Sequence, residues 1–275
     1  MRGALLQMTS SDDPGQNQDL VVDMIERAVQ DGAQICLTPE VTNCVSTSRS
    51  RQEDVLQREE HDTSLAAFRA AAQHAGIWLL IGSLALKTDD RFINRSYLIA
   101  PDGGVVAHYD KIHMFDVQVS ETETYRESAG YRPGETAVIA DTDFGQIGLC
   151  ICYDVRFPSL FAALARAGAS IITVPSAFSP VTGDAHWETL LRARAIETGA
   201  WILAPAQTGT HAALHGKARK THGHSMVIDP WGTVVLDAGT EPGIYRFDID
   251  PAQAARARAK IPALDHIRPF ATPQL

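Results

Sequence analysis

Residues 145–168 read GQIGLCICYDVRFPSLFAALARAG, and this stretch decides the fold. The run IGLCI (147–151) is apolar throughout and predicts a buried β-strand, whereas 157–167 has the apolar spacing of a helix that Gly168 ends. A strand that turns into a helix is the repeating unit of layered α/β proteins. Cys152 lies at the turn between the two elements.

Strand and helix patterns alternate on both sides of this segment. Strands are predicted at 2–8, 35–38, 78–86, 96–100, 105–109, 137–141, 146–151, 170–175, 201–206, 226–228, 233–236 and 244–249. Helices are predicted between Pro14 and Gly32 and at 65–75, 157–167, 186–197 and 251–260. Because the strands carry Ile, Val and Leu on both faces, we expect helices to cover the sheets. A chain of 275 residues of this type commonly folds as one unit, so we predict a single α/β domain over 1–275.

Two segments lack a regular period. Residues 111–134 are polar and acidic, and a loop of this length inside a compact domain is usually functional. The tail at 262–275 is interrupted by prolines but carries Leu264, Ile267 and Phe270, which a lone monomer has little means of burying. We therefore expect the tail to lie at a subunit interface of a homodimer or a higher homo-oligomer.

Composition and charge exclude several classes of protein. The net charge of −9 and the absence of a basic stripe argue against nucleic acid as a partner. The longest apolar run, 77–86, is far shorter than the ~20 residues that cross a bilayer, so no membrane is expected. The N-terminus lacks the long apolar region of a secretory signal, which predicts a cytoplasmic protein. The four cysteines show no disulfide framework, and we expect reduced thiols.

Cys152 is the leading candidate for a nucleophile. A thiol on a sharp strand-to-helix turn has the geometry of a nucleophile elbow, where backbone N–H groups favour a thiolate and hold an oxyanion. Strand alternation predicts that Gly148, Cys150 and Cys152 share one face, with the glycine making space near the thiol. The alternative is a buried free cysteine, the commoner fate of a lone Cys. Cys150 is interpreted as such a packing residue.

Two charged residues at other strand ends strengthen this interpretation. Glu40 follows the apolar strand ICLTP at the carboxyl end, where α/β sheets usually place ligand chemistry, and its carboxylate can accept the thiol proton. Lys111 follows the strand VVAHYD; as an isolated residue it is a solvated surface lysine. A base, a cation and a thiol at three strand ends together indicate a catalytic site.

Five motifs in order give the chain a resemblance to the nitrilase-like carbon–nitrogen hydrolases. They are TPE (38–40), YDKIHMFD (109–116), GLCICYDVRFP (148–158), PSAFSPVTGDAHWETLLRARAIET (175–198) and GHSMVIDPWG (223–232). The resemblance implies a Glu-Lys-Cys triad of Glu40, Lys111 and Cys152, with a further carboxylate at Glu127. It also implies a four-layer αββα sandwich that pairs in a dimer as αββα-αββα.

The hypothesis for the mechanism follows from these side chains. Glu40 accepts the Cys152 proton, and the sulfur attacks an amide carbon. Lys111 and the backbone N–H of Tyr153 stabilise the oxyanion, and ammonia leaves with the proton that Glu40 returns. A water activated by Glu40 then cleaves the thioester, while Glu127 orients substrate, water or Lys111. This chemistry needs no metal and no cofactor.

The later motifs resemble the branch that acts on deaminated glutathione, with the ω-amidases for α-ketoglutaramate and α-ketosuccinamate as close relatives. Both substrate classes are small anionic ω-amides, so a basic patch is needed to hold a carboxylate. The segment 215–224 offers Lys217, Arg219 and Lys220, although a solvated loop is the simpler interpretation. Thr182 and His186, in a loop before the helix at 186–197, are further candidates for the pocket wall.

Several nearby residues are interpreted as structural. A group of four histidines at 211, 215, 222 and 224 invites a zinc site, but the predicted loop offers neither helical spacing nor acidic partners, so no metal site is predicted. Asp154 and Arg156 are expected to form structural bonds after the nucleophile.

The triad alone leaves alternatives open. A nitrilase, or an acyltransferase that passes the thioester to an amine, uses the same three side chains, and a substrate panel scored for ammonia separates them. A non-catalytic interaction module with the same fold is a further hypothesis. The intact Cys152, Lys111 and Glu40 argue against it, and iodoacetamide labelling that blocks turnover tests it.

Overall fold

The computed structural model describes residues 1–119, 121 and 123–271, which form two six-stranded mixed sheets. The first sheet has the order β16-β1-β2-β3-β4-β5, with bounds Gly243–Asp248, Arg2–Gln7, Ile35–Leu37, Trp78–Lys87, Phe92–Ile99 and Val105–Asp110. The second has the order β15-β14-β11-β10-β9-β8, with bounds Val234–Asp237, Met226–Ile228, Trp201–Ala204, Ile171–Thr173, Gly145–Leu149 and Val138–Thr142.

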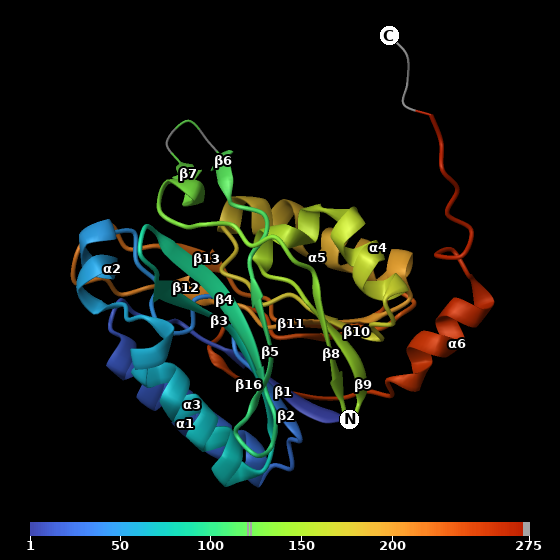
Figure 1. The fold of residues 1–275 in the computed structure, drawn as a ribbon, viewed down its shortest axis with the longest axis horizontal. Helices are drawn as coiled ribbons and strands as arrows, with labels where there is room; N and C mark the ends of the chain where they lie inside the picture. Colours follow the sequence, from blue (N-terminus) through green and yellow to red (C-terminus); the bar gives the residue numbers. More distant parts are fainter. Residues whose placement is uncertain (120, 122, 272–275) are drawn as a thin grey trace.

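The two sheets pack face to face and helices cover their outer faces (Figure 1). The central core joins Leu5, Leu37 and Leu80 of the first sheet to Ile147 and Ile202 of the second, all fully buried. Helices α1 (Pro14–Gln30) and α3 (Thr63–Ala75) cover the first sheet, and α4 (Pro158–Arg166) and α5 (Pro180–Thr198) cover the second. The predicted four-layer αββα sandwich is confirmed.

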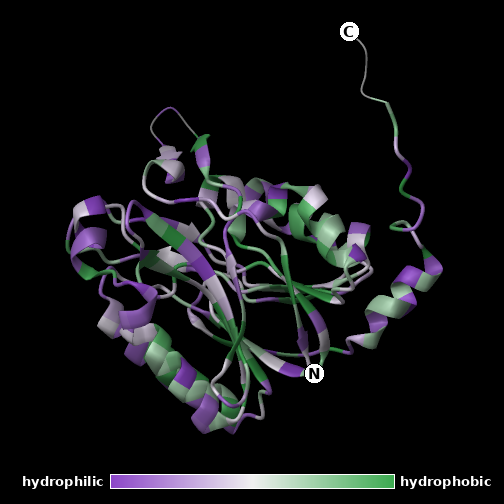
Figure 2. Ribbon diagram, viewed as in Figure 1, coloured by the Kyte–Doolittle hydropathy of each residue, from purple (hydrophilic) through white to green (hydrophobic). Residues whose placement is uncertain are grey.

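Local chemistry explains where the two covering helices of the first sheet begin and end. The Asp13 side chain caps α1 by accepting from the backbone N–H groups of Gly15 and Gln16, and Asp62 caps α3 by accepting from Leu65. Gly76 ends α3 in the left-handed conformation that favours glycine. Hydrophobic and hydrophilic residues alternate along α1 and α3 (Figure 2), and apolar ones such as Val21, Ile25 and Phe68 are buried in the core against the first sheet.

Several elements differ from the sequence prediction. The segment 111–134 is not a plain loop, because β6 (Asp116–Gln118) and β7 (Thr124–Arg126) pair there as a hairpin, followed by the short helix η2 (Glu127–Ala129). Helix α5 begins at Pro180 rather than at 186, since proline suits the first helical turn. The prediction also missed short elements, namely α2 (Arg49–Val55), η1 (Glu59–His61), β12 (Thr208–Thr210) and β13 (Lys220–His222).

The chain leaves the sandwich after α6 (Ala252–Lys260) and extends away from the body of the molecule (Figure 1). Ile267 and Phe270 are 52% and 90% exposed in this segment. Residues 272–275 of the predicted interface tail lie outside the described residues. Among the described residues, no helix is long and apolar enough to cross a membrane.

Candidate active site

Two sharp backbone turns bring the carboxylate and the thiol to the same end of the sandwich. Glu40 follows β2, and the next residue, Val41, has a positive φ of 47° that a β-branched residue rarely adopts. The Ser83 hydroxyl accepts from the Val41 N–H at 2.7 Å and holds this turn. Gly82 lets β3 approach, because a Cβ there would lie 2.0 Å from the carbonyl oxygen of Thr38.

Cys152 stands on the predicted sharp turn, at a φ of 48°. Its N–H donates to the carbonyl of Pro175 at 2.9 Å, and the short helix η3 (Cys152–Arg156) continues the chain toward α4. Gly148 serves a different purpose from the one predicted. A Cβ at Gly148 would meet Leu164 of α4 at 3.2 Å, so this glycine makes room for the helix rather than for the thiol.

The buried Lys111 joins two carboxylates, one buried (Glu40) and one half-buried (Glu127). Its Nζ donates to Glu40 Oε1 at 2.8 Å and to the two oxygens of Glu127 at 3.0 and 2.9 Å. The other oxygen of Glu40 accepts from the Ala177 N–H at 2.8 Å, and Glu127 also accepts from the Phe115 N–H at 2.7 Å. The Lys111 side chain is 2% exposed. We refer to Glu40, Lys111, Glu127 and Cys152 as the reacting cluster.

Asn94 is a member of the site that the sequence prediction missed. Its Nδ2 donates to Glu40 Oε1 at 2.9 Å and to Glu127 Oε1 at 3.5 Å, so one amide group spans both carboxylates. Its Oδ1 is buried without a hydrogen-bond partner among the described residues. The signal was hidden because β4 begins at Phe92, whereas the strand was predicted to start only at 96.

Charge and burial fix the protonation of the reacting cluster. Burial raises the pKa of the Glu40 carboxyl, but the Lys111 ammonium outweighs it and holds that pKa below its ordinary value. Burial lowers the pKa of Lys111, yet Glu127 and Glu40 raise it well above its ordinary value. Burial, followed by the Glu40 charge, raises the pKa of the Cys152 thiol, with Lys111 opposing. At rest, Cys152 is therefore a thiol, Glu40 a carboxylate and Lys111 an ammonium.

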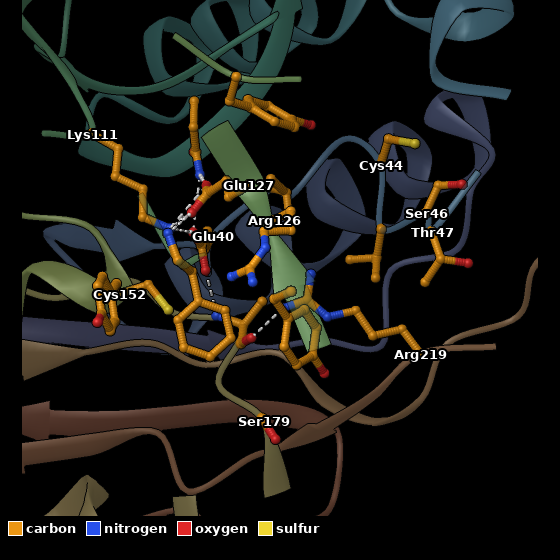
Figure 3. Close-up of a pocket in the computed structure, with 18 of the residues that line it drawn as sticks. Glu40, Cys44, Ser46, Thr47, Lys111, Arg126, Glu127, Cys152, Ser179 and Arg219 are labelled. Atoms are coloured by element: carbon orange, nitrogen blue, oxygen red, sulfur yellow. Dashed lines mark hydrogen bonds and ion pairs between the residues drawn. The ribbon is translucent and has the colours of Figure 1, made fainter. Parts of the chain in front are cut away.

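A cavity of about 290 Å³ opens onto this cluster (Figure 3). Its lining includes all four residues of the reacting cluster, Asn94 and Tyr153. Three arginines from three separate segments, Arg49, Arg126 and Arg219, also line it, and we refer to them as the arginine wall. A concave pocket in which polar side chains hold fixed positions is typical of a small-molecule binding site.

The substrate-binding candidates divide between the cavity and its surroundings. Arg219 lines the cavity, whereas Lys217 is exposed and does not. The sequence predicts Thr182 and His186 in a loop, and this prediction is wrong. Both residues lie in α5, and neither lines the cavity. His186 instead contacts the guanidinium of Arg156 through Nδ1 at 3.2 Å.

The residues interpreted as structural form extensive bonds. Buried Asp154 accepts from the Ile151 N–H at 2.8 Å, the Tyr109 hydroxyl at 2.7 Å and the His113 N–H at 3.1 Å. The Arg156 guanidinium lies over the rings of Tyr153 and Phe178. Cys150 is fully buried, and burial raises the pKa of its thiol well above the ordinary value.

The four histidines are separated in their contacts. His211 is buried between the Ser10 carbonyl and the Thr221 hydroxyl, at 2.8 and 2.7 Å. His222 and His224 stack on each other and pair with Asp184 and Asp237, respectively. No group of three metal-binding side chains converges within the described part of the chain.

The fold is that of a layered α/β protein with a polar cavity at one end, and comparison with known proteins identifies its family. The carbon–nitrogen hydrolase family model matches residues 2–259, and the chain belongs to this family. It is a hydrolase that acts on amides, as the amidases among its relatives are.

The most informative relatives are named deaminated glutathione amidase. The Synechocystis protein is 39% identical over 269 residues and covers 96% of both chains. The Yersinia enterocolitica protein is 38% identical over 96% of this chain and 92% of its own length. The human protein is 38% identical over 97% of this chain and 82% of its own length.

Solved structures share the fold. The Caenorhabditis elegans NitFhit protein superposes with a TM-score of 0.88 at 36% identity, over 97% of this chain and 65% of that chain. Saccharomyces cerevisiae Nit3, from branch 10 of the nitrilase superfamily, gives 0.84 at 28% identity, over 95% and 94%. A Glu-to-Gln mutant of the amidase from Nesterenkonia sp. AN1 gives a TM-score of 0.78 at 29% identity, over 95% of this chain and 98% of that chain. It carries acrylamide added to its active site cysteine.

Proposed function

We propose that the protein hydrolyses the amide bond of a small anionic ω-amide, with deaminated glutathione as the substrate. The observation that carries this proposal is the meeting of two features in one cavity. A buried ammonium held between two carboxylates lies beside a thiol on a sharp turn, and three arginines line the same space. The first supplies the means of amide cleavage, and the second favours an anionic substrate. The names of the relatives support the same substrate.

In the first half of the reaction, Cys152 forms a thioester. Because the thiol is protonated at rest, the proton moves to Glu40 as the sulfur attacks the amide carbon. The negative charge that develops on the carbonyl oxygen is stabilised by Lys111 and the Tyr153 backbone N–H. The carbon–nitrogen bond breaks when Glu40 returns the proton to the leaving nitrogen. This leaving group is cysteinylglycine from deaminated glutathione, and ammonia from α-ketoglutaramate.

In the second half, water cleaves the thioester. Glu40 accepts a proton from the water, whose oxygen bonds to the acyl carbon, and the proton then returns to the sulfur as the carboxylic acid leaves. Glu127 holds the ammonium of Lys111 through two short contacts. Glu40 binds the same ammonium through Oε1, so its other oxygen, which accepts from the Ala177 N–H, is the one that exchanges protons. No step requires a metal or a cofactor.

The test is a steady-state comparison of deaminated glutathione with α-ketoglutaramate, α-ketosuccinamate, a simple nitrile and hydroxylamine as acyl acceptor. We expect deaminated glutathione to give the highest kcat/KM and Cys152→Ala to abolish its cleavage. A higher kcat/KM for α-ketoglutaramate would make the protein an ω-amidase. Faster nitrile hydrolysis, or acyl transfer that outruns hydrolysis, would move it to the nitrilase or acyltransferase class.

We further propose that the chain works as one domain over 1–275 in a homodimer or a higher homo-oligomer in the cytoplasm. The exposure of Ile267 and Phe270 supports a partner surface for the tail at 262–275, because burying such side chains stabilises association. A thiol nucleophile is kept reduced in the cytoplasm, which supports that location. Sedimentation of the full chain and of a chain ending at 261 tests the assembly: we expect loss of the oligomer on truncation.

A further inference from the structure

The cavity contains more positive charge than the proposed reaction requires. The reacting cluster has one ammonium and two carboxylates, which leaves it with one formal negative charge. The arginine wall adds three guanidinium groups, and within residues 1–119, 121 and 123–271 none of the three forms an ion pair with a carboxylate. The lining as a whole therefore has two positive charges in excess. A dianion neutralises this excess and a monoanion does not.

The three arginines differ in how they are held. Arg49 donates to Gln52 at 2.9 Å and lies over the rings of Phe92 and Tyr131. Arg219 donates to the Ala177 carbonyl at 2.6 Å, but its Nε is buried with no partner among the described residues.

Arg126 is the least restrained member of the arginine wall. Across the described parts of the chain, its guanidinium has no hydrogen bond, ion pair or aromatic contact, and it is exposed. Arg126 is the last residue of β7 and directly precedes Glu127. Figure 3 shows Arg126 and Arg219 reaching into the space between Cys152 on one side and Ser46 and Thr47 on the other.

The order of the chemical steps assigns the two ends of the substrate. The acyl part stays bonded to the Cys152 sulfur while the amine departs, so the acyl part occupies the inner space and the amine the outer space. Arg219 belongs to the inner space, because it bonds to Ala177, whose N–H holds Glu40. A two-residue leaving group spans about 7 Å and brings its own carboxylate to the outer space.

We infer that Arg126 is a specificity-determining residue that binds a carboxylate on the leaving group, while Arg219 binds the carboxylate of the acyl part. The site then selects dianionic amides with one carboxylate on each side of the bond that breaks, over ω-amides whose leaving group is ammonia. This inference rests on the proposed function and refines it. A charge-assisted bond to an exposed guanidinium is worth about 10- to 50-fold in kcat/KM.

The test combines Arg126→Gln with the removal of one substrate carboxylate. Deaminated glutathione is compared with the same compound whose terminal carboxylate is an amide, and with α-ketoglutaramate. We expect Arg126→Gln to lower kcat/KM for deaminated glutathione about 10- to 50-fold, and for the two monoanions less than about twofold. Arg132→Gln is the matched control, because this exposed arginine does not line the cavity, and it should change none of the three.

Two results would overturn the inference. An equal loss for all three substrates would mean that Arg126 acts through Glu127, and no loss would mean that it does not bind the leaving group. If the unaltered enzyme hydrolysed none of them, the proposed function would fail separately. Calorimetry on the Cys152→Ala protein then decides the inference: it stands only if the dianion binds about 10-fold more tightly than its amide and Arg126→Gln removes that preference.

Discussion

The inner and outer ends of the cavity differ in how far their charged groups are buried and paired. At the inner end, Lys111 and Glu40 are buried and Glu127 is half-buried, and the three satisfy one another through contacts of 2.8–3.0 Å. At the outer end, Arg126 comes from the hairpin of β6 and β7, is exposed, and has no hydrogen bond or ion pair among the described residues. The charged groups of the inner end are therefore paired with one another before a ligand binds, whereas the outer end offers a charged group that can pair with the ligand.

We propose that this difference separates catalysis, at the inner end, from substrate selection, at the outer end. A buried charge without a partner costs several kcal/mol, so the groups of the inner end depend on one another for stability as well as for chemistry. An exposed guanidinium is hydrated and costs little when unpaired, so the outer end can vary without unfolding the protein. Substitutions at the two ends should therefore differ in kind, and the following experiments test that separation.

The largest effect is expected at the nucleophile. Cys152→Ala should lower kcat by at least about 10⁴-fold, because no other group forms the acyl bond. Cys150→Ala, two residues away and fully buried, should retain activity and lower the free energy of unfolding by about 1–2 kcal/mol. Initial rates and urea unfolding measure both. Equal activity of the two variants would remove Cys152 from its assigned role.

The next effect concerns the cation of the inner end. Lys111→Met leaves the buried Glu40 carboxylate and the half-buried Glu127 carboxylate without their shared cation, so we expect the free energy of unfolding to fall by about 3–5 kcal/mol. Activity should fall by about 10²- to 10³-fold with the loss of oxyanion stabilisation.

The double variant Lys111→Met with Glu127→Gln separates the two effects of this cation. Because one of the unpaired charges is removed, the double variant should regain part of the stability and none of the activity. Urea unfolding and initial rates are again the measurements. Recovery of both together would show that Lys111 has only a structural role.

Arg219, which borders the inner space, and the exposed Lys217 form a matched pair of neighbouring cations for the substitutions Arg219→Gln and Lys217→Gln. Arg219 lines the cavity and Lys217 does not, so we expect Arg219→Gln to raise KM about 10- to 50-fold and Lys217→Gln to change it less than about twofold. Lys217→Gln should leave the free energy of unfolding nearly unchanged, whereas Arg219→Gln loses the bond to the Ala177 carbonyl and should lower it by about 1 kcal/mol. An equal rise in KM for the two variants would contradict the proposed binding of the acyl carboxylate by Arg219.

Much of the fold could be predicted because it depends on strong local patterns. The apolar strands around 35–38 and 146–151 and the helix stops at Gly32, Gly76 and Gly168 are all visible in the sequence. The hairpin of β6 and β7 was not, since three-residue strands with alternating exposure carry no sustained period. The start of helix α5 was predicted at 186 instead of 180, because its first turn contains Pro180 and Gly183 instead of an apolar stripe.

Some residues of the candidate site could likewise be predicted from the sequence, and others could not. Glu40, Lys111 and Cys152 follow strands, so the strand order and the family motifs could predict that the three side chains lie close together. Asn94 could not, because an asparagine inside a strand looks like any polar residue until both its carboxylate partners are in place. Arg126 was missed for a related reason: its significance lies in the cavity that the hairpin forms.

The smallest expected change is in the dependence of the reaction on pH, and it sharpens the description of the inner end. The folded-state pKa of Glu40 lies below its ordinary value of 4.5, because Lys111 outweighs burial. Stability from this carboxylate is therefore complete above pH 4.5 and is lost as the pH falls through the lower folded value. The proton acceptor remains ionised throughout that upper range.

The thiol side gives the complementary limit. Since burial and Glu40 raise the pKa of Cys152, the free thiolate is scarce at neutral pH, and the proton has to move to Glu40 during attack. We therefore expect kcat/KM to change less than about twofold between pH 5.5 and 8 in buffers of constant ionic strength. A tenfold rise per pH unit would instead indicate a preformed thiolate. The inner end would then act by stabilising an ion pair, and Glu40 would lose its place as the proton acceptor.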